Sequence, residues 1–280
     1  MSGRVAIVTD STASISPELA AELGIIVVPL TVNLGEKGFD EDTVDPDEVL
    51  DALVRKMLVS TAPPAPPAFF WAYQDAMAAG ADTIVSIHIS EKLSKTCEAA
   101  RLAAEQLPIP VHVVDGRSIA MAMGYVVVAA AEAARAGADL REIAAVIEHR
   151  RTHSTPLFYV DTLEYLRRGG RIGKAAALVG TALELKPLLT VEDGLIAPLT
   201  RVRKSDRAIN RLEEIALERA GSGPVDIAIH HVGAAEGADA LARRLRGRFS
   251  SVGRWCVNPV SWVLGVHSGP GMLGVVVSKR

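Results

Sequence analysis

The chain is poor in aromatic residues and in cysteine, and neither sign of charge is in strong excess. Aromatic residues make up 4% of its 280 residues and hydrophobic residues 49%, so the core must be largely aliphatic. The formal net charge of -3 gives no general attraction to nucleic acid or to an anionic membrane. The two cysteines, Cys97 and Cys256, form no Cys-x-x-Cys motif, which suits a reducing compartment and provides no metal signature. We therefore expect no metal site and no nucleic-acid partner.

Long hydrophobic runs are also missing. The most apolar run, from Ile119 to Ala131, is interrupted by Gly124 and is shorter than the roughly 18 residues that a membrane span needs. The first residues lack the architecture of a signal peptide. We expect a cytoplasmic protein without a membrane span. This expectation does not exclude a transient contact with a membrane surface.

Two familiar catalytic motifs are incomplete. A Gly-Lys pair occurs at Gly173-Lys174, but Arg168 replaces the first glycine of a P-loop and Ala175 replaces its serine or threonine. A Gly-x-Ser-x-Gly elbow is likewise excluded, because Val266 and Pro270 stand where its two glycines are needed. Neither a nucleotide-binding loop nor a hydrolase elbow is predicted.

Strands and helices alternate through the first half of the chain, which predicts a largely parallel sheet. Aliphatic strands are expected at residues 4–9, 25–32, 83–89 and 111–114. Helices should open at Ser16-Pro17 and Asp45-Pro46, where a capping side chain precedes a proline in the first helical position. Further helices are expected at residues 69–79, after Ser94, and at 119–136 and 140–151. The proline-rich residues 60–67 predict a stiff, extended path on the surface.

The pattern changes after His153. Asp193-Gly194 predicts a hairpin turn between strands at 187–191 and 195–199. Other strands are expected at 157–160, 225–231, 256–260 and 273–277, with helices at 175–182, 205–218 and 237–246. We place a boundary near residues 153–156, which gives an N-terminal α/β domain of residues 1–154 and a C-terminal α/β domain of residues 155–280.

Polar residues stand at four places that could meet a ligand. Asp10-Ser11-Thr12 follows the first strand, at the sheet edge where α/β proteins bind ligands. Ser94 precedes a helix whose free N–H groups could bind a carboxylate or a phosphate, although ordinary capping is the commoner role of such a serine. Arg171 follows a two-glycine turn, and His267 precedes a Gly-Pro-Gly turn that predicts a defined loop. The alternative for Arg171 is a solvated basic turn, and the alternative for His267 is a loop histidine exposed to water.

Several of these stretches together carry a resemblance to a known family. They are the opening Val8-Thr-Asp-Ser-Thr-Ala13, the loop from Thr61 to Phe69, Leu93-Ser94-x-Thr96, Tyr165-Leu-x-x-Gly-Gly-Arg171, Lys186-Pro187 and His267-x-Gly-Pro-Gly271. Over essentially its whole length the chain resembles the DegV family, the fatty-acid-binding proteins that serve bacterial fatty acid kinase as its lipid-carrying subunit.

The resemblance implies a two-domain α/β fold, mostly parallel in the first domain and mixed in the second, with a lipid tunnel between the domains. It implies that a fatty acid such as palmitate or oleate is the ligand, that no cofactor is needed, and that an ATP-binding kinase is the partner. The residues implied to hold the carboxylate are Thr61, Ser94, Arg171 and His267. We add four supporting candidates, namely Ser11, Thr96, Ser268 and Gly269.

This chain departs from the family pattern at four positions near the expected head group. Ala62 and Ala65 replace hydroxyl-bearing residues, Pro63 replaces an amide-bearing residue, and Lys95 replaces a glycine. We expect Lys95 either to narrow the site or to add a second cation.

Three readings of the function follow. The first is a non-catalytic carrier that presents its lipid to a kinase, with a docking face formed by Arg201, Arg203, Lys204 and Arg207, unless these residues are a solvated helix start. The second is a lipid or ester hydrolase with Ser94 as nucleophile and His267 as base. The third is a protein-interaction module with a collapsed cleft between its domains.

Overall fold

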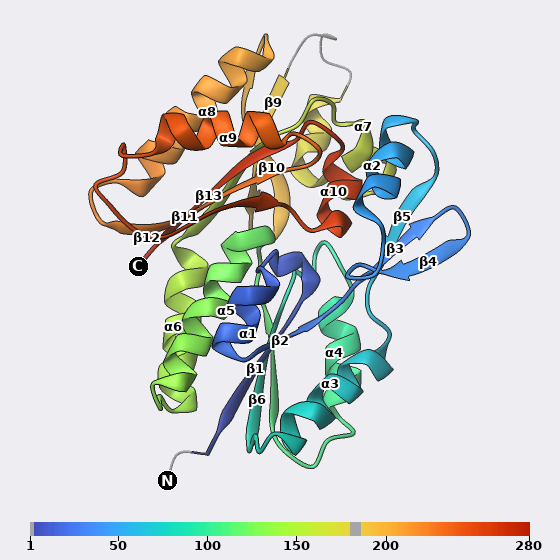
Figure 1. Cartoon of the computed structure of the whole chain (residues 1–280), viewed down its shortest axis with the longest axis vertical. Helices are drawn as coiled ribbons and strands as arrows, with labels where there is room; N and C mark the ends of the chain where they lie inside the picture. Colours follow the sequence, from blue (N-terminus) through green and yellow to red (C-terminus); the bar gives the residue numbers. More distant parts are fainter. Residues whose placement is uncertain (1–2, 180–185) are drawn as a thin grey trace.

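The computed structural model describes residues 3–179 and 186–280. Its first layer is a four-stranded parallel sheet in the order β2-β1-β6-β7, as the alternating pattern predicts (Figure 1). The strands are β1 (Val5–Asp10), β2 (Ile25–Val28), β6 (Thr83–His88) and β7 (Val111–Asp115). One face packs on α3 (Pro66–Ala78) and α4 (Thr96–Ala104). The other packs on α1 (Pro17–Leu23), α5 (Ala120–Arg135) and α6 (Leu140–Thr152).

A six-stranded mixed sheet forms the second layer, in the order β10-β9-β8-β13-β11-β12. Its strands are β8 (Ser154–Tyr159), β9 (Lys186–Glu192), β10 (Leu195–Val202), β11 (Pro224–His231), β12 (Ser251–Pro259) and β13 (Leu273–Lys279). All pairs are antiparallel except β11 with β12. One face carries α8 (Ser205–Ala220) and α9 (Ala235–Leu245), and the other faces α5.

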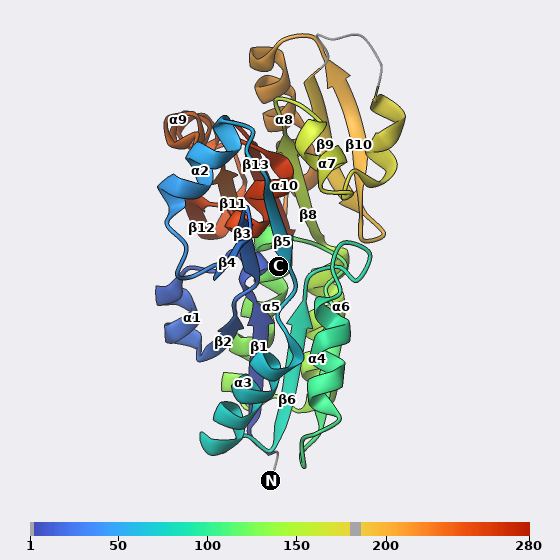
Figure 2. The ribbon, with the colours of Figure 1, turned by 90° about the vertical axis from the view of Figure 1, so that its right-hand side faces the viewer.

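A small third sheet, in the order β4-β3-β5, links the two layers. It consists of β3 (Thr31–Leu34), β4 (Lys37–Asp40) and β5 (Val59–Ala62), and it packs with α2 (Pro46–Val54) against α10 (Trp262–Ser268). Figure 2 shows these strands between the two larger sheets. The first half of the chain thus contacts a helix of the second half, and the division into domains 1–154 and 155–280 stays a prediction.

Local signals in the sequence mark several element ends correctly. The Ser16 side chain caps α1 by accepting from the N–H of Leu19, and Asp45 caps α2 by accepting from Asp47. Asp193 and Gly194 both have positive φ in the turn between β9 and β10. Of the described helices, none is long and apolar enough to cross a membrane.

Four expectations need correction. Residues 25–32 form two strands rather than one, because Pro29 has no N–H to continue a ladder. The proline-rich stretch is not extended to its end: β5 includes residues up to Ala62 and Ala65 has an extended backbone, but α3 begins at Pro66. Residues 175–182 were expected to be helical; the 3-10 helix η2 (Gly173–Leu178) lies there, and residues 180–185 lie outside the described part. The loop expected around His267 is instead the last turn of α10.

Candidate functional site

A cavity lies where the three sheets meet, and its lining is mostly aliphatic. It encloses about 870 Å³ of space between atoms, including the part that opens to solvent, and much of it is narrow. Strands β5, β8, β10, β11 and β13 contribute to the walls, together with α10 and α7 (Glu164–Arg168). Apolar lining residues include Leu30, Ile89, Ile119, Phe158, Val263 and Met272. A narrow apolar space of this kind suits a thin, flexible hydrocarbon chain.

Thr61 and His267 meet in this cavity although they are far apart in the sequence. The Oγ1 atom of Thr61 lies 2.8 Å from Nε2 of His267. Burial, and then the charge of Arg171, lower the pKa of His267 to about 4, so its imidazole is neutral at pH 7. The other ring nitrogen, Nδ1, is buried without a hydrogen-bond partner in the structure. It packs against Gly169, where a β-carbon would collide with the ring.

Arg171 lies on the same side of the cavity. It follows Gly170, whose φ of 68° closes the end of α7. Its Nε donates to the carbonyl of Leu93 at 3.0 Å, and one terminal nitrogen donates to the carbonyl of Gly169 at 2.7 Å. No carboxylate of the described residues forms an ion pair with this guanidinium, which therefore keeps donors available for an acidic ligand.

Ser94 completes the set of four predicted residues that line the cavity. The alternative that Ser94 caps α4 is wrong: Lys95 precedes the first helical residue, and no side chain caps the helix. The hydroxyl of Ser94 instead lies 2.8 Å from Oγ1 of Thr96. Lys95 is exposed and does not line the cavity, so it does not narrow the site.

Of the four supporting candidates, one lines the cavity and three do not. Ser268 lines the cavity and donates to the carbonyl of Leu264. Ser11, Thr96 and Gly269 do not line it. Ser11 accepts from the N–H of Leu30, and Gly269, with φ of 82°, ends α10.

One polar lining residue was missed as a site candidate. His230 on β11 is fully buried, and burial lowers its pKa to about 4. Its Nδ1 lies 3.3 Å from the carbonyl of Asn258, and its Nε2 accepts from the N–H of Met121. The His230-His231 pair at the end of an apolar strand is the signal in the sequence that could have pointed to it.

The hydrogen bonds of Ser94 and His267 do not support the hydrolase alternative. Ser94 pairs with Thr96, and His267 pairs with Thr61 rather than with Ser94. Within residues 3–179 and 186–280, no group of three or more histidine, cysteine or acidic side chains could hold a metal ion. The basic residues of the expected docking face, Arg201, Arg203, Lys204 and Arg207, are all exposed at the end of β10 and the start of α8.

Comparisons with known proteins show the family and the fold. Residues 4–280 match a family model described as "Uncharacterised protein, DegV family". A DegV domain-containing protein of Streptomyces coelicolor is 50% identical over the full length of both chains. A DegV family protein from Thermus thermophilus, whose structure is described as fatty acid binding, superposes with a TM-score of 0.93 at 33% identity, covering 99% of this chain and 100% of that one. DegV from Bacillus subtilis, described as a fatty acid binding protein, gives 0.91 at 28% identity, with both chains fully covered.

Proposed function

The chain belongs to the DegV family, and from this premise we propose that it binds one long-chain fatty acid, such as palmitate or oleate, in its cavity. One observation carries the proposal: Thr61, Ser94, Arg171 and His267 line the same mostly aliphatic space. The Thermus and Bacillus relatives that are described as fatty acid binding share the fold across essentially the whole chain.

In this proposal the four polar residues hold the carboxylate. The guanidinium of Arg171 supplies the positive charge and two-pronged geometry that a carboxylate prefers. Thr61 and Ser94 supply hydroxyl donors, and His267 supplies an N–H once its ring nitrogen turns from Thr61 to the ligand. Because His267 is next to Arg171 and buried, a bound anion should raise its pKa back toward the ordinary value.

Burial of the alkyl chain dominates the proposed binding free energy. A chain of about sixteen carbons offers on the order of 10 kcal/mol at ~0.8 kcal/mol per buried CH₂. The polar residues then fix the orientation of the acid more than its affinity.

We further propose that the protein is a cytoplasmic, non-catalytic carrier that presents the carboxylate to an ATP-dependent fatty acid kinase. Exposed Arg201, Arg203, Lys204 and Arg207 would form the docking face, because a basic patch steers an acidic partner. Phosphorylation of the bound acid would then be performed by the partner.

The test of lipid binding uses the full chain in native form. Native mass spectrometry should detect one acyl chain per protein, and the delipidated protein should take up added palmitate or oleate. A protein that carries no acyl chain and takes up neither acid would contradict the proposal. Kinase presentation is tested separately, by phosphorylation of bound acid with ATP and a fatty acid kinase.

A further inference from the structure

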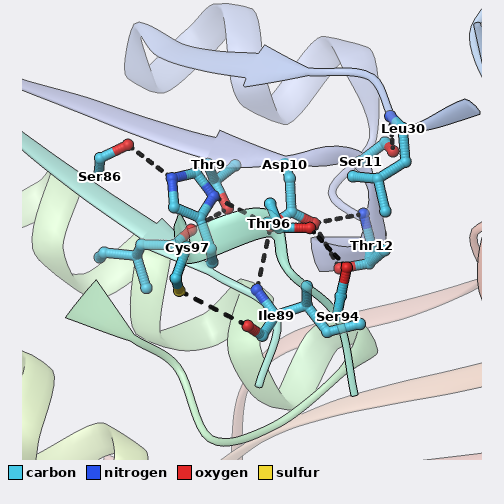
Figure 3. Close-up of polar contacts among 12 residues, drawn as sticks. Thr9, Asp10, Ser11, Thr12, Leu30, Ser86, Ile89, Ser94, Thr96 and Cys97 are labelled. Carbon is cyan, nitrogen blue, oxygen red and sulfur yellow. Dashed lines mark hydrogen bonds and ion pairs between the residues drawn. The ribbon is translucent and has the colours of Figure 1, made fainter. Parts of the chain in front are cut away.

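The loop from Ile89 to Lys95 connects β6 to α4 and organises the polar end of the cavity. It contributes Ile89, Leu93 and Ser94 to the lining, and the carbonyl of Leu93 accepts from Arg171. A shift of this loop would therefore move a hydroxyl and a guanidinium at the same time. What fixes the loop at its start lies outside the cavity, in a buried polar cluster around Asp10 (Figure 3).

Asp10 ends β1 and is completely buried, with four donors around its carboxylate. Its Oδ2 accepts from the N–H of Ile89 and from Nδ1 of His88, both at 3.0 Å. Its Oδ1 accepts from the N–H and from the hydroxyl of Thr12. A buried carboxylate is costly unless its lone pairs are satisfied, and here each oxygen has two donors.

The hydrogen bonds of the cluster continue from His88 to Ser86 and Tyr73, and their donors and acceptors can be assigned consistently. The hydroxyl of Tyr73 donates to Ser86, whose Oγ lies 2.7 Å from Nε2 of His88. With the Ser86 proton directed to Nε2, a neutral His88 donates from Nδ1 to Asp10, and every donor has an acceptor. Neither Asp10 nor His88 lines the cavity, so neither can touch a ligand in it.

Asp10 also controls a second part of the cavity wall. By accepting from Thr12 it shapes the turn Ser11–Ala13, and Ser11 in that turn accepts from the N–H of Leu30. Leu30 is a lining residue. One buried carboxylate thus anchors two segments that reach the cavity from different strands.

We propose that Asp10 and His88 are positioning residues of the carboxylate site: they set the place of Ser94 and Arg171 by holding the N–H of Ile89. The inference rests on the proposed function, since it presumes that Ser94 and Arg171 meet an acid. It predicts that loosening this anchor impairs recognition of the head group while the apolar cavity continues to bind an alkyl chain.

The test compares palmitic acid with hexadecanol, which has the same chain and a neutral head. Asp10→Asn places an amide where two donors point, so the ratio of the two dissociation constants should move about tenfold against the acid. Tyr73→Phe is the matched control, because it removes a buried hydroxyl of the same cluster but leaves all four donors of Asp10. This variant should keep the wild-type ratio.

A second pair of variants decides the matter if Asp10→Asn does not fold. His88→Asn keeps an N–H near the position of Nδ1 and should retain the preference for the acid, whereas His88→Leu should lose part of it. If Asp10→Asn or His88→Leu weakens binding of the acid and of the alcohol equally, the ratio of the two dissociation constants is unchanged. That result would overturn the inference and leave these residues a purely structural role. Wild-type protein that binds neither probe would instead contradict the proposed function.

Discussion

At Gly169 the backbone passes so close to His267 that any side chain would collide with Nδ1 and Cε1 of the ring. Gly170, its neighbour, has open space around it but a φ of 68°. The two glycines therefore serve different purposes, since one leaves room for the imidazole and the other closes the helix end. This contrast makes a controlled pair of substitutions available.

We expect Gly169→Ala to displace His267 and to weaken its contact with Thr61. Fatty acid binding should fall several-fold, and the preference for acid over alcohol should shrink. Gly170→Ala should cost about 1 kcal/mol of stability from backbone strain, with the preference unchanged. Isothermal titration with both ligands measures this, and an unaltered preference in Gly169→Ala would show that His267 is not held by this contact.

The pKa values of His230 and His267 lead to a prediction for the ligand-free protein. Both are lowered from 6.5 to about 4. Between these pH values the two histidines bind protons in the unfolded chain but not in the folded chain. Their contribution to the free energy of unfolding is therefore fully present above pH 6.5 and is lost as the pH falls toward 4. The free energies of unfolding measured in urea at pH 7.5 and at pH 5 should differ by about 2 kcal/mol per histidine. His267→Gln should reduce this difference, and an equal pH dependence in that variant would refute the assignment.

At the scale of elements, local signals predicted most of the fold. Ser16, Asp45 and the Asp193-Gly194 turn act through neighbours a few residues away, so the sequence displays them directly. The parallel sheet followed from the alternation of strands and helices, and the four cavity residues were implied by the resemblance to the DegV family.

Features that depend on distant partners could not be read in the same way. Ser94 does not cap its helix because its hydroxyl pairs with Thr96, and α10 extends through His267 while packed against β3 and β5. The anchoring of Ile89 by Asp10 joins residues that are 79 positions apart. The polar residues after β1 were noticed, but no local pattern says which backbone group they bind.

The hairpin of β9 and β10 is tied to the loop at 89–95 by one buried hydrogen bond. Ser90 donates from Oγ to the carbonyl of Gly194 at 2.7 Å. A β-carbon at Gly194 would collide with the Oγ atom of Ser90. We expect Ser90→Ala to cost about 1–2 kcal/mol, because it leaves a buried carbonyl unpaired. Gly194→Ala should cost more in wild type than in the Ser90→Ala background, where that collision is absent. Additive costs in a double-mutant cycle would contradict this account.

At the scale of the whole molecule, the cavity is built from both halves of the chain. Thr61 and Ser94 come from the first half, and Arg171 and His267 from the second. In our proposal the bound acid therefore joins the two halves, and the kinase meets a surface that lies elsewhere. Docking and lipid binding should then be separable.

Charge reversal on α8 examines this separation. Arg207→Glu, in the proposed docking face, should lower the rate of phosphorylation of bound acid at least several-fold without changing lipid content. Arg219→Glu, exposed at the opposite end of the same helix, should leave the rate unchanged. Equal effects from the two variants would show that net charge, rather than this face, affects the kinase.

Palmitate labelled with ¹³C at the carboxyl carbon shows whether a fatty acid carboxylate lies against Arg171 and His267. Bound to wild-type protein, the labelled acid should give one NMR resonance. Its chemical shift should show that the carboxyl group stays ionised well below the pH at which the free acid titrates, because Arg171 lowers the pKa of the bound carboxyl. In Arg171→Ala the acid should remain bound, but its resonance should move and titrate at higher pH. A bound carboxyl that titrates like the free acid and is unaffected by Arg171→Ala would contradict the account.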